Sequence, residues 1–260
     1  MLLTSINVIA RWVEKLKRLF FDNNITRRKN YNANIVKPTF FVVKHLKKFI
    51  YDSIARYVSA SKSVLDVGCG EQPMRGLIEK YGGAYIGVDI SQNQQGSVAV
   101  ISSINKVSFH NSTFDLILCT EVLEHVSDTY SLFFELSRLL RPGGIIILTS
   151  PFAFSLHEEP YDYVRVTPYQ IIECAKKSNL EIVDLKTSGN ELEVMATVWD
   201  IMWSSIGKNK LWGKTWKVIM RLPVNLMVLL LSYLFNSVLP KKYYLHVLCI
   251  FKIKIVGVGD

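Results

Sequence analysis

Residues 63–73 read SVLDVGCGEQP, the pattern of a strand followed by a glycine turn and a helix. The run 64–67 is short, apolar and β-branched, as is typical of a buried strand. Gly68 and Gly70 allow a tight turn in which no side chain keeps a ligand away from the backbone. Pro73 suits the first turn of a helix, because the N–H that it lacks has no helical partner there. Open α/β sheets build nucleotide sites from such units, at the carboxyl ends of their strands.

Three later stretches continue the alternation of strands, turns and helices. Residues 85–90 (YIGVDI) predict a second strand. It ends at Asp89, about twenty residues after the glycine turn, a spacing that suits a carboxylate bonding both hydroxyls of a ribose. Residues 113–119 predict another strand, and residues 139–148 predict a helix end, a Pro-Gly-Gly turn and a further apolar strand. The order of elements predicts an α/β fold.

These motifs resemble, in their order, those of class I S-adenosylmethionine-dependent methyltransferases of the type 11 kind: VLDVGCG, GVDI, FDLILCTEVLEHV and LLRPGGIIILTSPF. The resemblance covers residues 60–188 and a last strand at 243–254. It implies a Rossmann-like, doubly wound sheet of seven mostly parallel strands, with an antiparallel last strand. N-terminal helices and a helical insertion before the last strand complete the expected fold. Residues 157–168, HEEPYDYVRVTP, are similar to a subgroup found among surface-polysaccharide biosynthesis proteins.

The resemblance also implies S-adenosylmethionine as the cofactor and indicates its site. The residues expected to bind it are Asp66, Gly68, Cys69, Gly70, Asp89, Ile90, Ser103 and Glu121. The glycine turn would line the methionine end, Asp89 would hold the ribose and Ile90 would pack on the adenine. The alternative for Asp89 is a loop cap. The family usually carries an acid for the adenine amine where this chain has Ser102 or Ser103, and a hydroxyl accepts that bond less strongly.

Methyl transfer from a sulfonium is an in-line displacement, so the protein mainly has to hold both reactants in position. A hydroxyl acceptor must also lose a proton, and a nearby base helps. We expect His157 to be that base and Asp162 to hold it. Acceptor contacts are expected from His125, Tyr161 and Arg165, the last of which suits a phosphate or carboxylate. The alternative is an Asp162–Arg165 pair that only locks the loop to itself.

A metal site is a further alternative at the same place. Glu121, Glu124 and His125, with His157 supplied by a later loop, form a possible set of oxygen and nitrogen ligands. Similar sets in some small-RNA and ubiquinone-pathway O-methyltransferases hold magnesium. The other interpretation is that Glu121 and His125 merely frame the pocket. We expect no metal.

Charge is distributed unevenly along the 260 residues, whose net charge is +9. Residues 1–60 carry +9, residues 61–200 carry −8 and residues 201–260 carry +8. Both basic flanks are rich in large apolar residues, which favours a membrane surface over nucleic acid. Four segments are expected: basic amphipathic helices at 1–60, a cofactor-binding core at 61–190, an apolar helical insertion at 191–242, and the last strand and tail at 243–260.

The two flanks predict contact with a membrane surface. Residues 1–21 have the spacing of a basic amphipathic helix, and charges interrupt the apolar run too often for a signal peptide. Such a helix lies on a membrane surface or, as the alternative, packs its apolar stripe on the domain. The run 226–235 is shorter than the about twenty residues that a spanning helix needs. It indicates an interfacial or re-entrant helix pair, with a buried hairpin as the alternative. The four cysteines lack paired spacing, so a reducing compartment fits. We expect a cytoplasmic enzyme at the inner face of the membrane.

The sequence therefore predicts a methyltransferase that O-methylates a sugar or a lipid-linked glycan intermediate. A quinone or another lipid acceptor is the first alternative, and a non-catalytic membrane adaptor on the same fold is the second. A dinucleotide-dependent oxidoreductase is disfavoured because Pro73 stands where the third glycine of G-x-G-x-x-G would be. An RNA methyltransferase is disfavoured because no RNA-binding module is present, so no nucleic-acid partner is expected.

Overall fold

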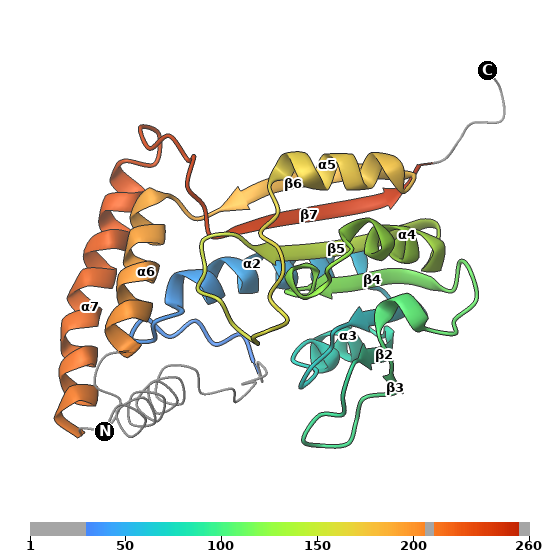
Figure 1. Ribbon diagram of the computed structural model, residues 1–260, viewed down its shortest axis with the longest axis horizontal. Coiled ribbons are helices and arrows are strands. Elements are labelled where there is room, and N and C mark those ends of the chain that lie inside the picture. Colours follow the sequence, from blue (N-terminus) through green and yellow to red (C-terminus); the bar gives the residue numbers. More distant parts are fainter. Residues whose placement is uncertain (1–29, 206–210, 255–260) are drawn as a thin grey trace, which may run out of the picture.

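The computed structural model describes residues 30–205 and 211–254, so the predicted helix at 1–21 lies outside the described residues. Its centre is a seven-stranded sheet in the order β3-β2-β1-β4-β5-β7-β6 (Figure 1). The strands are β1 (Ser63–Val67), β2 (Ala84–Asp89), β3 (Val100–Ile101), β4 (Phe114–Thr120), β5 (Leu140–Pro151), β6 (Leu180–Ser188) and β7 (His246–Ile253). Only β7 runs antiparallel to its neighbours, β5 and β6. The predicted fold class is confirmed.

Helices cover both faces of the sheet. They are α2 (Phe40–Tyr57), α3 (Arg75–Lys80), α4 (Thr129–Leu139), α5 (Pro168–Lys177), α6 (Glu191–Ser205) and α7 (Leu211–Leu234), with short 3₁₀ turns η1 (Ile104–Lys106) and η2 (Leu123–His125). Successive side chains of a strand point to opposite faces. Leu65 therefore joins the apolar core beneath α4 and α5, whereas Val64 joins the core beneath α2.

Local sequence explains where several helices begin. The Asp128 carboxylate accepts a hydrogen bond from the Ser131 backbone N–H at 3.0 Å and caps α4. The Thr167 hydroxyl caps α5, and Pro168 occupies its first turn. Both are standard ways to satisfy the free N–H groups at a helix start.

The connection between β2 and β3 contains no helix, as predicted from its length. Side-chain hydrogen bonds shape it instead. The side-chain oxygen of Asn93 accepts a hydrogen bond from the Ser97 backbone N–H at 2.9 Å. The side-chain amide nitrogen of Asn93 donates to the Gly70 backbone carbonyl at 3.2 Å. The loop is thereby tied to the glycine turn.

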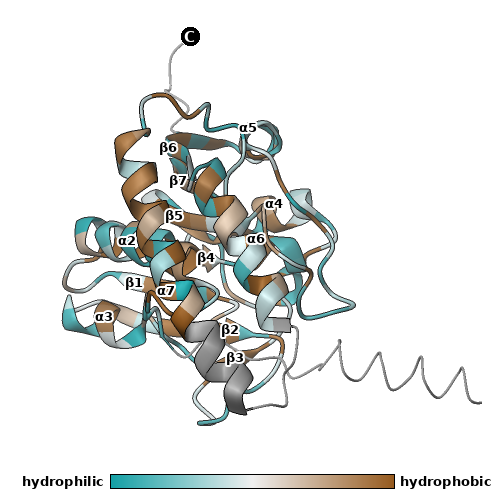
Figure 2. Cartoon of the chain, turned by 90° about the vertical axis from the view of Figure 1, so that its left-hand side faces the viewer, coloured by the Kyte–Doolittle hydropathy of each residue, from teal (hydrophilic) through white to brown (hydrophobic). Residues whose placement is uncertain are grey.

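The insertion before the last strand forms the predicted pair of helices, α6 and α7. Figure 1 shows them beyond the carboxyl ends of β5 and β6, and Figure 2 views the molecule from that end. α7 continues through Pro223. Among the helices that the structure describes, none is both long and apolar enough to cross a membrane.

Candidate functional site

The predicted cofactor residues gather at the carboxyl edge of the parallel strands. In the turn after β1, Gly68 has a φ of +66°, and a Cβ atom there would lie 2.3 Å from the Val122 Cγ2 atom. The backbone N–H groups of Gly68 and Cys69 both donate to the Val88 carbonyl, at 2.8 and 3.1 Å. The turn is therefore fixed on β2 and packs against Val122, so position 68 requires a residue without a side chain.

Asp89 ends β2 and closes this turn. It is 8% exposed. One carboxylate oxygen accepts from the Gly70 N–H at 2.9 Å, and the other accepts from the Ser91 N–H at 3.2 Å. These two hydrogen bonds cap the loop, which was the alternative role considered for Asp89. Each carboxylate oxygen can accept more than one hydrogen bond, which is the capacity that contact with two ribose hydroxyls requires.

The residues expected at the adenine lie next to Asp89. Ile90 is 72% exposed, which is unusual for an isoleucine beside a buried strand and leaves an apolar surface for a flat ring. The Ser102 N–H donates to the Asp89 carbonyl at 2.9 Å, which brings the segment before η1 alongside. Ser103 in that segment is exposed.

Asp66 lies inside the site, under the glycine turn. It is 3% exposed, and its carboxylate accepts a hydrogen bond from the Tyr85 hydroxyl at 2.7 Å. Burial raises the pKa of Asp66 to about 7, because a carboxylate loses its hydration there. Cys69 is buried as well. Asp66 therefore holds a proton that a nearby cationic group would displace near neutral pH.

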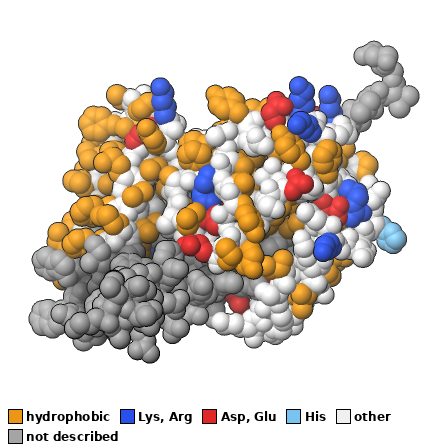
Figure 3. Space-filling model, viewed as in Figure 1, with side chains coloured by type: hydrophobic (Ala, Val, Ile, Leu, Met, Phe, Trp, Pro, Cys, Tyr) orange, Lys and Arg blue, Asp and Glu red, His pale blue; other side chains and the backbone are white. Residues whose placement is uncertain are grey.

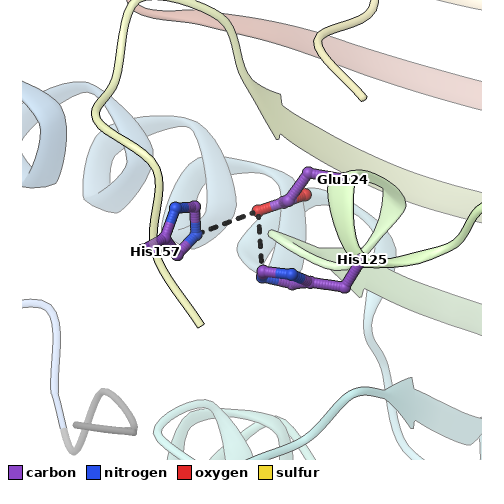
Figure 4. Close-up of side chains that lie close together, drawn as sticks. All are labelled: Glu124, His125 and His157. Atoms are coloured by element: carbon purple, nitrogen blue, oxygen red, sulfur yellow. Dashed lines mark ion pairs between the residues drawn. The ribbon is translucent and has the colours of Figure 1, made fainter. Parts of the chain in front are cut away.

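A carboxylate and two histidines meet beside this turn (Figure 4). Glu124 and His125 come from η2, and His157 comes from the loop after β5. The Glu124 Oε1 atom lies 3.8 Å from Nε2 of both His125 and His157. Glu124 is fully buried, and neither of its oxygens has a hydrogen-bond partner among the described residues. Burial raises the pKa of Glu124.

A backbone carbonyl near Nδ1 orients each of the two imidazole rings. Nδ1 of His125 lies 2.8 Å from the Tyr161 carbonyl, and Nδ1 of His157 lies 3.2 Å from the Ser155 carbonyl. A carbonyl only accepts hydrogen bonds, so Nδ1 carries the proton in both rings and Nε2 faces Glu124. Burial alone would lower the pKa of His157, but Glu124 and Asp162 raise it overall.

The loop after β5 holds both partners that we predicted for Asp162. Its carboxylate lies 3.2 Å from Nδ1 of His157. It also accepts hydrogen bonds from the two terminal guanidinium nitrogens, Nη1 and Nη2, of Arg165. The alternative in which Asp162 and Arg165 lock the loop is thus visible in the structure, and Arg165 is engaged within the chain. The side chain of Tyr161 is exposed.

Glu121 has partners that the sequence did not indicate. It follows β4 with a φ of +57°, which is uncommon outside glycine and often marks a functional site. Its carboxylate accepts from the Thr149 hydroxyl at 2.8 Å and lies 3.3 Å from Nε2 of His246, which is fully buried. His246 begins β7, opposite Pro151 at the end of β5. The antiparallel direction of the last strand is the signal that would have placed it here.

Residues 65–148 match a family model described as "Methyltransferase domain". The chain is 26% identical over 156 residues to a protein of Aromatoleum aromaticum named ubiquinone biosynthesis O-methyltransferase. That alignment covers 48% of this chain and 67% of the relative. Across the first relatives of this name, the chain matches between 43% and 67% of their length.

Solved structures share the fold at low sequence identity. A putative sarcosine dimethylglycine methyltransferase from Galdieria sulphuraria superposes with a TM-score of 0.54 at 13% identity, covering 82% of this chain and 87% of that one. The [4+2]-cyclase SpnF superposes with a TM-score of 0.52 at 15% identity, covering 78% and 80%. The fold alone therefore does not decide the reaction.

Proposed function

We propose that the chain, which contains a class I S-adenosylmethionine-dependent methyltransferase domain, transfers a methyl group to an oxygen atom of a small acceptor. The family match confirms the predicted methyltransferase class and S-adenosylmethionine as its cofactor. The observation that carries the O-methyl assignment is the buried Glu124 beside Nε2 of His157, since an oxygen acceptor needs a group that takes its proton.

The cofactor supplies a methyl group that its sulfonium already activates. The chain then has to orient the acceptor and receive one proton. Nε2 of His157 takes that proton, and the imidazolium that forms favours the ionised form of Glu124 at 3.8 Å, so that the two charges stabilise each other. Asp162 holds the ring through Nδ1. Its pairing with Arg165 keeps Asp162 ionised in this role, because Arg165 helps to lower the Asp162 pKa despite partial burial.

A phenolic, lipid-like acceptor of the quinone type is the first candidate. A phenol has a pKa near about 10 and loses its proton to a histidine more readily than a sugar hydroxyl does. The names of the relatives support an oxygen acceptor of this class. A lipid-linked glycan is the second candidate and rests on the motif at 157–168. Both agree with the predicted place of the protein, at the inner face of a membrane.

A divalent cation also fits the cluster, although the sequence favoured no metal. One ligand atom from each of Glu124, His125 and His157 lies within 4.8 Å of the others. Each imidazole presents Nε2 while a backbone carbonyl orients Nδ1, an arrangement typical of metal-binding histidines. The unpartnered oxygens of Glu124 are groups that such an ion would satisfy. A bound ion would lower the pKa of an acceptor hydroxyl.

His157→Ala tests the assignment of the base. Turnover of a catechol carrying an apolar tail should fall about 100-fold or more. The dissociation constant of S-adenosylhomocysteine, measured by calorimetry, should stay within about twofold. His110→Ala is the matched control, because His110 is exposed and lies outside the site. Near-normal turnover in His157→Ala would remove His157 from the chemistry.

Chelation separates the two roles of the cluster. If His157 acts as the base without an ion, prolonged treatment with a strong chelator leaves the turnover unchanged. If an ion is required, activity is lost and one divalent ion restores it. In that case Glu124→Gln should weaken binding of the added ion, which calorimetry measures independently of activity.

A further inference from the structure

The helices α6 and α7 bury polar side chains and expose apolar ones. In α6 the polar residues Glu193, Thr197 and Asp200 are buried. The exposed residues of the same helix include Met195, Val198, Trp199 and Met202. A helix at the surface of a soluble protein has the opposite arrangement, with its apolar stripe toward the core.

α7 repeats this inversion. Its buried residues include Arg221, Asn225 and Ser232. Its exposed residues include Leu222, Leu226, Met227, Leu230, Tyr233 and Leu234. Polar groups, together with the buried Ala196 and Val228, therefore form the inner seam of the helix pair, and apolar groups form its outer surface.

Ion pairs and hydrogen bonds stabilise much of the inner seam, although Oδ2 of Asp200, Nη2 of Arg221 and Oδ1 of Asn225 have no hydrogen-bond partner among the described residues. The Arg221 guanidinium donates to Asp200 at 2.9 Å and to the Val36 carbonyl at 2.9 Å. Glu193 pairs with Lys44 at 3.0 Å and with His45 at 2.6 Å. Buried polar groups need such partners. The inversion is thus built into the packing and is no accident of exposed loops.

We call the exposed apolar side chains of Met195 to Met202 and Leu222 to Leu234 the outer face. Of the 25 large hydrophobic residues exposed in the described parts of the chain, 15 lie between residues 191 and 243. The apolar exposure is thus concentrated on one helix pair and its end, as Figure 3 shows at the left of the view. Apolar patches of this kind mark surfaces that another apolar body covers.

Charge indicates which body covers it. α7 contains no acidic residue, and the exposed Lys241 and Lys242 follow its end. Cationic side chains beside an apolar helix face suit the anionic surface of a lipid bilayer. None of the described helices can span a bilayer, so insertion is limited to one leaflet. We propose that the outer face of α6 and α7 inserts into one leaflet of an anionic bilayer.

The helix pair lies at the same end of the sheet as the loop that carries His157 (Figure 1). Phe154 of this loop packs against the large apolar cluster to which Ala196 of α6 belongs. Resting on the proposed function, this placement would let the enzyme take its acceptor from the bilayer.

Vesicle flotation of the full chain tests the insertion without using activity. The probe is a vesicle of three parts phosphatidylcholine to one part phosphatidylglycerol. The wild type should float with these vesicles at low salt, and flotation should fall but not vanish at high salt, because salt weakens the charge term and not the apolar one. Wild-type protein that ignores the vesicles at low salt would overturn the proposal.

Charge placed on the outer face provides the decisive variant. Met227→Glu with Leu230→Glu should lower the fraction bound to vesicles at least tenfold, because a carboxylate is costly in the acyl region. Phe134→Glu with Ile172→Glu is the matched control, since it adds the same charge at exposed apolar positions of α4 and α5. Equal binding by the two double variants would contradict insertion by α6 and α7. Both variants should still bind S-adenosylhomocysteine, which confirms their folding.

A fluorescent label distinguishes the bilayer from other occupants of the outer face. The four native cysteines are buried, so a label attaches selectively at Met227→Cys. An environment-sensitive dye there should shift to the blue when vesicles are added, whereas the same dye at Phe134→Cys should not. If the Met227 label is already shielded without vesicles, and the charged variant changes the mass of the particle in light scattering, a second copy covers the face and the proposal is wrong.

Discussion

Two buried carboxyl groups, those of Asp66 and Glu124, determine the chemistry of this site. Asp66 retains one hydroxyl partner, Tyr85, whereas Glu124 retains no hydrogen-bond partner among the residues described. Burial disfavours the charged form of both groups. The ionisation of each carboxyl group therefore depends strongly on whether a cation lies close to it. Asp66 lies under the glycine turn, and Glu124 faces the two histidines.

Asp66 makes stability depend on pH. Its pKa is about 7 in the folded protein against 3.8 for the ordinary group, so the folded state holds the extra proton between these values. The free energy of unfolding is therefore highest at low pH and falls as pH rises from about 4 to about 7. Between about pH 5 and about pH 8 this group should remove roughly 3 kcal/mol.

Asp66→Asn should remove that dependence. Urea unfolding at about pH 5 and about pH 8 gives the difference directly, and the pH slope of the variant should be flatter by roughly 3 kcal/mol over this interval. Asp52→Asn serves as the control, because Asp52 is exposed and its pair with Lys48 is exposed as well. An unchanged slope in Asp66→Asn would show that Asp66 is ionised in the folded protein.

Some residue roles depend on contacts that no local pattern contains. His246 reaches Glu121 only because β7 runs antiparallel beside β5 and starts where β5 ends. Arg165 was expected to bind the acceptor, but Asp162, three residues earlier, already occupies its guanidinium. Motif positions such as Asp89 and Gly68 were predictable because a local strand and turn place them at the sheet edge.

Whole elements differ in how far the sequence predicts them. β2 and β4 agree with the predicted ranges 85–90 and 113–119 to within one residue, because short apolar runs mark them. The pair α6 and α7 was predicted as helices, but its orientation was not. Hydrophobicity alone indicates which face is apolar and does not say whether that face meets the core. Arg221 points inward toward the Val36 carbonyl, a partner from a distant segment, and Asp200 points inward toward Arg221.

The buried Asp200–Arg221 pair should hold α6 and α7 together. The two side chains are 4% and 6% exposed. Arg221→Met leaves the Asp200 carboxylate buried without its partner, which costs roughly 3–5 kcal/mol of unfolding free energy. Urea unfolding measures this loss.

Two further variants show whether the loss is specific to the buried pair. Asp200→Leu combined with Arg221→Met removes both charges and should recover most of the stability. Lys48→Met breaks an exposed pair of the same kind, with Asp52, and should have little effect. A double variant as unstable as Arg221→Met alone would mean that the guanidinium contact with Val36, and not the ion pair, holds the helices.

At the scale of the whole molecule, an acidic methyltransferase core lies between two basic, apolar flanks. The carboxyl edge of the sheet brings together the glycine turn, Asp89 and the cluster of Glu124, His125 and His157. The helix pair α6 and α7 stands at the same edge (Figure 1). This arrangement supports the two proposed roles: the core binds the cofactor, and the helix pair α6 and α7 brings the site close to a membrane-borne acceptor.

Calorimetric titration of the full chain with S-adenosylmethionine, and separately with NAD, measures directly whether the glycine turn and Asp89 bind the cofactor. We expect binding of S-adenosylmethionine and no binding of NAD. Asp89→Ala should weaken that binding by roughly 1.5–3 kcal/mol, the range for hydrogen bonds to a charged acceptor. Asp52→Ala, at an exposed position on α2, should leave it unchanged. Binding of NAD in place of S-adenosylmethionine, or a folded Asp89→Ala variant with unchanged affinity, would rule out this cofactor site.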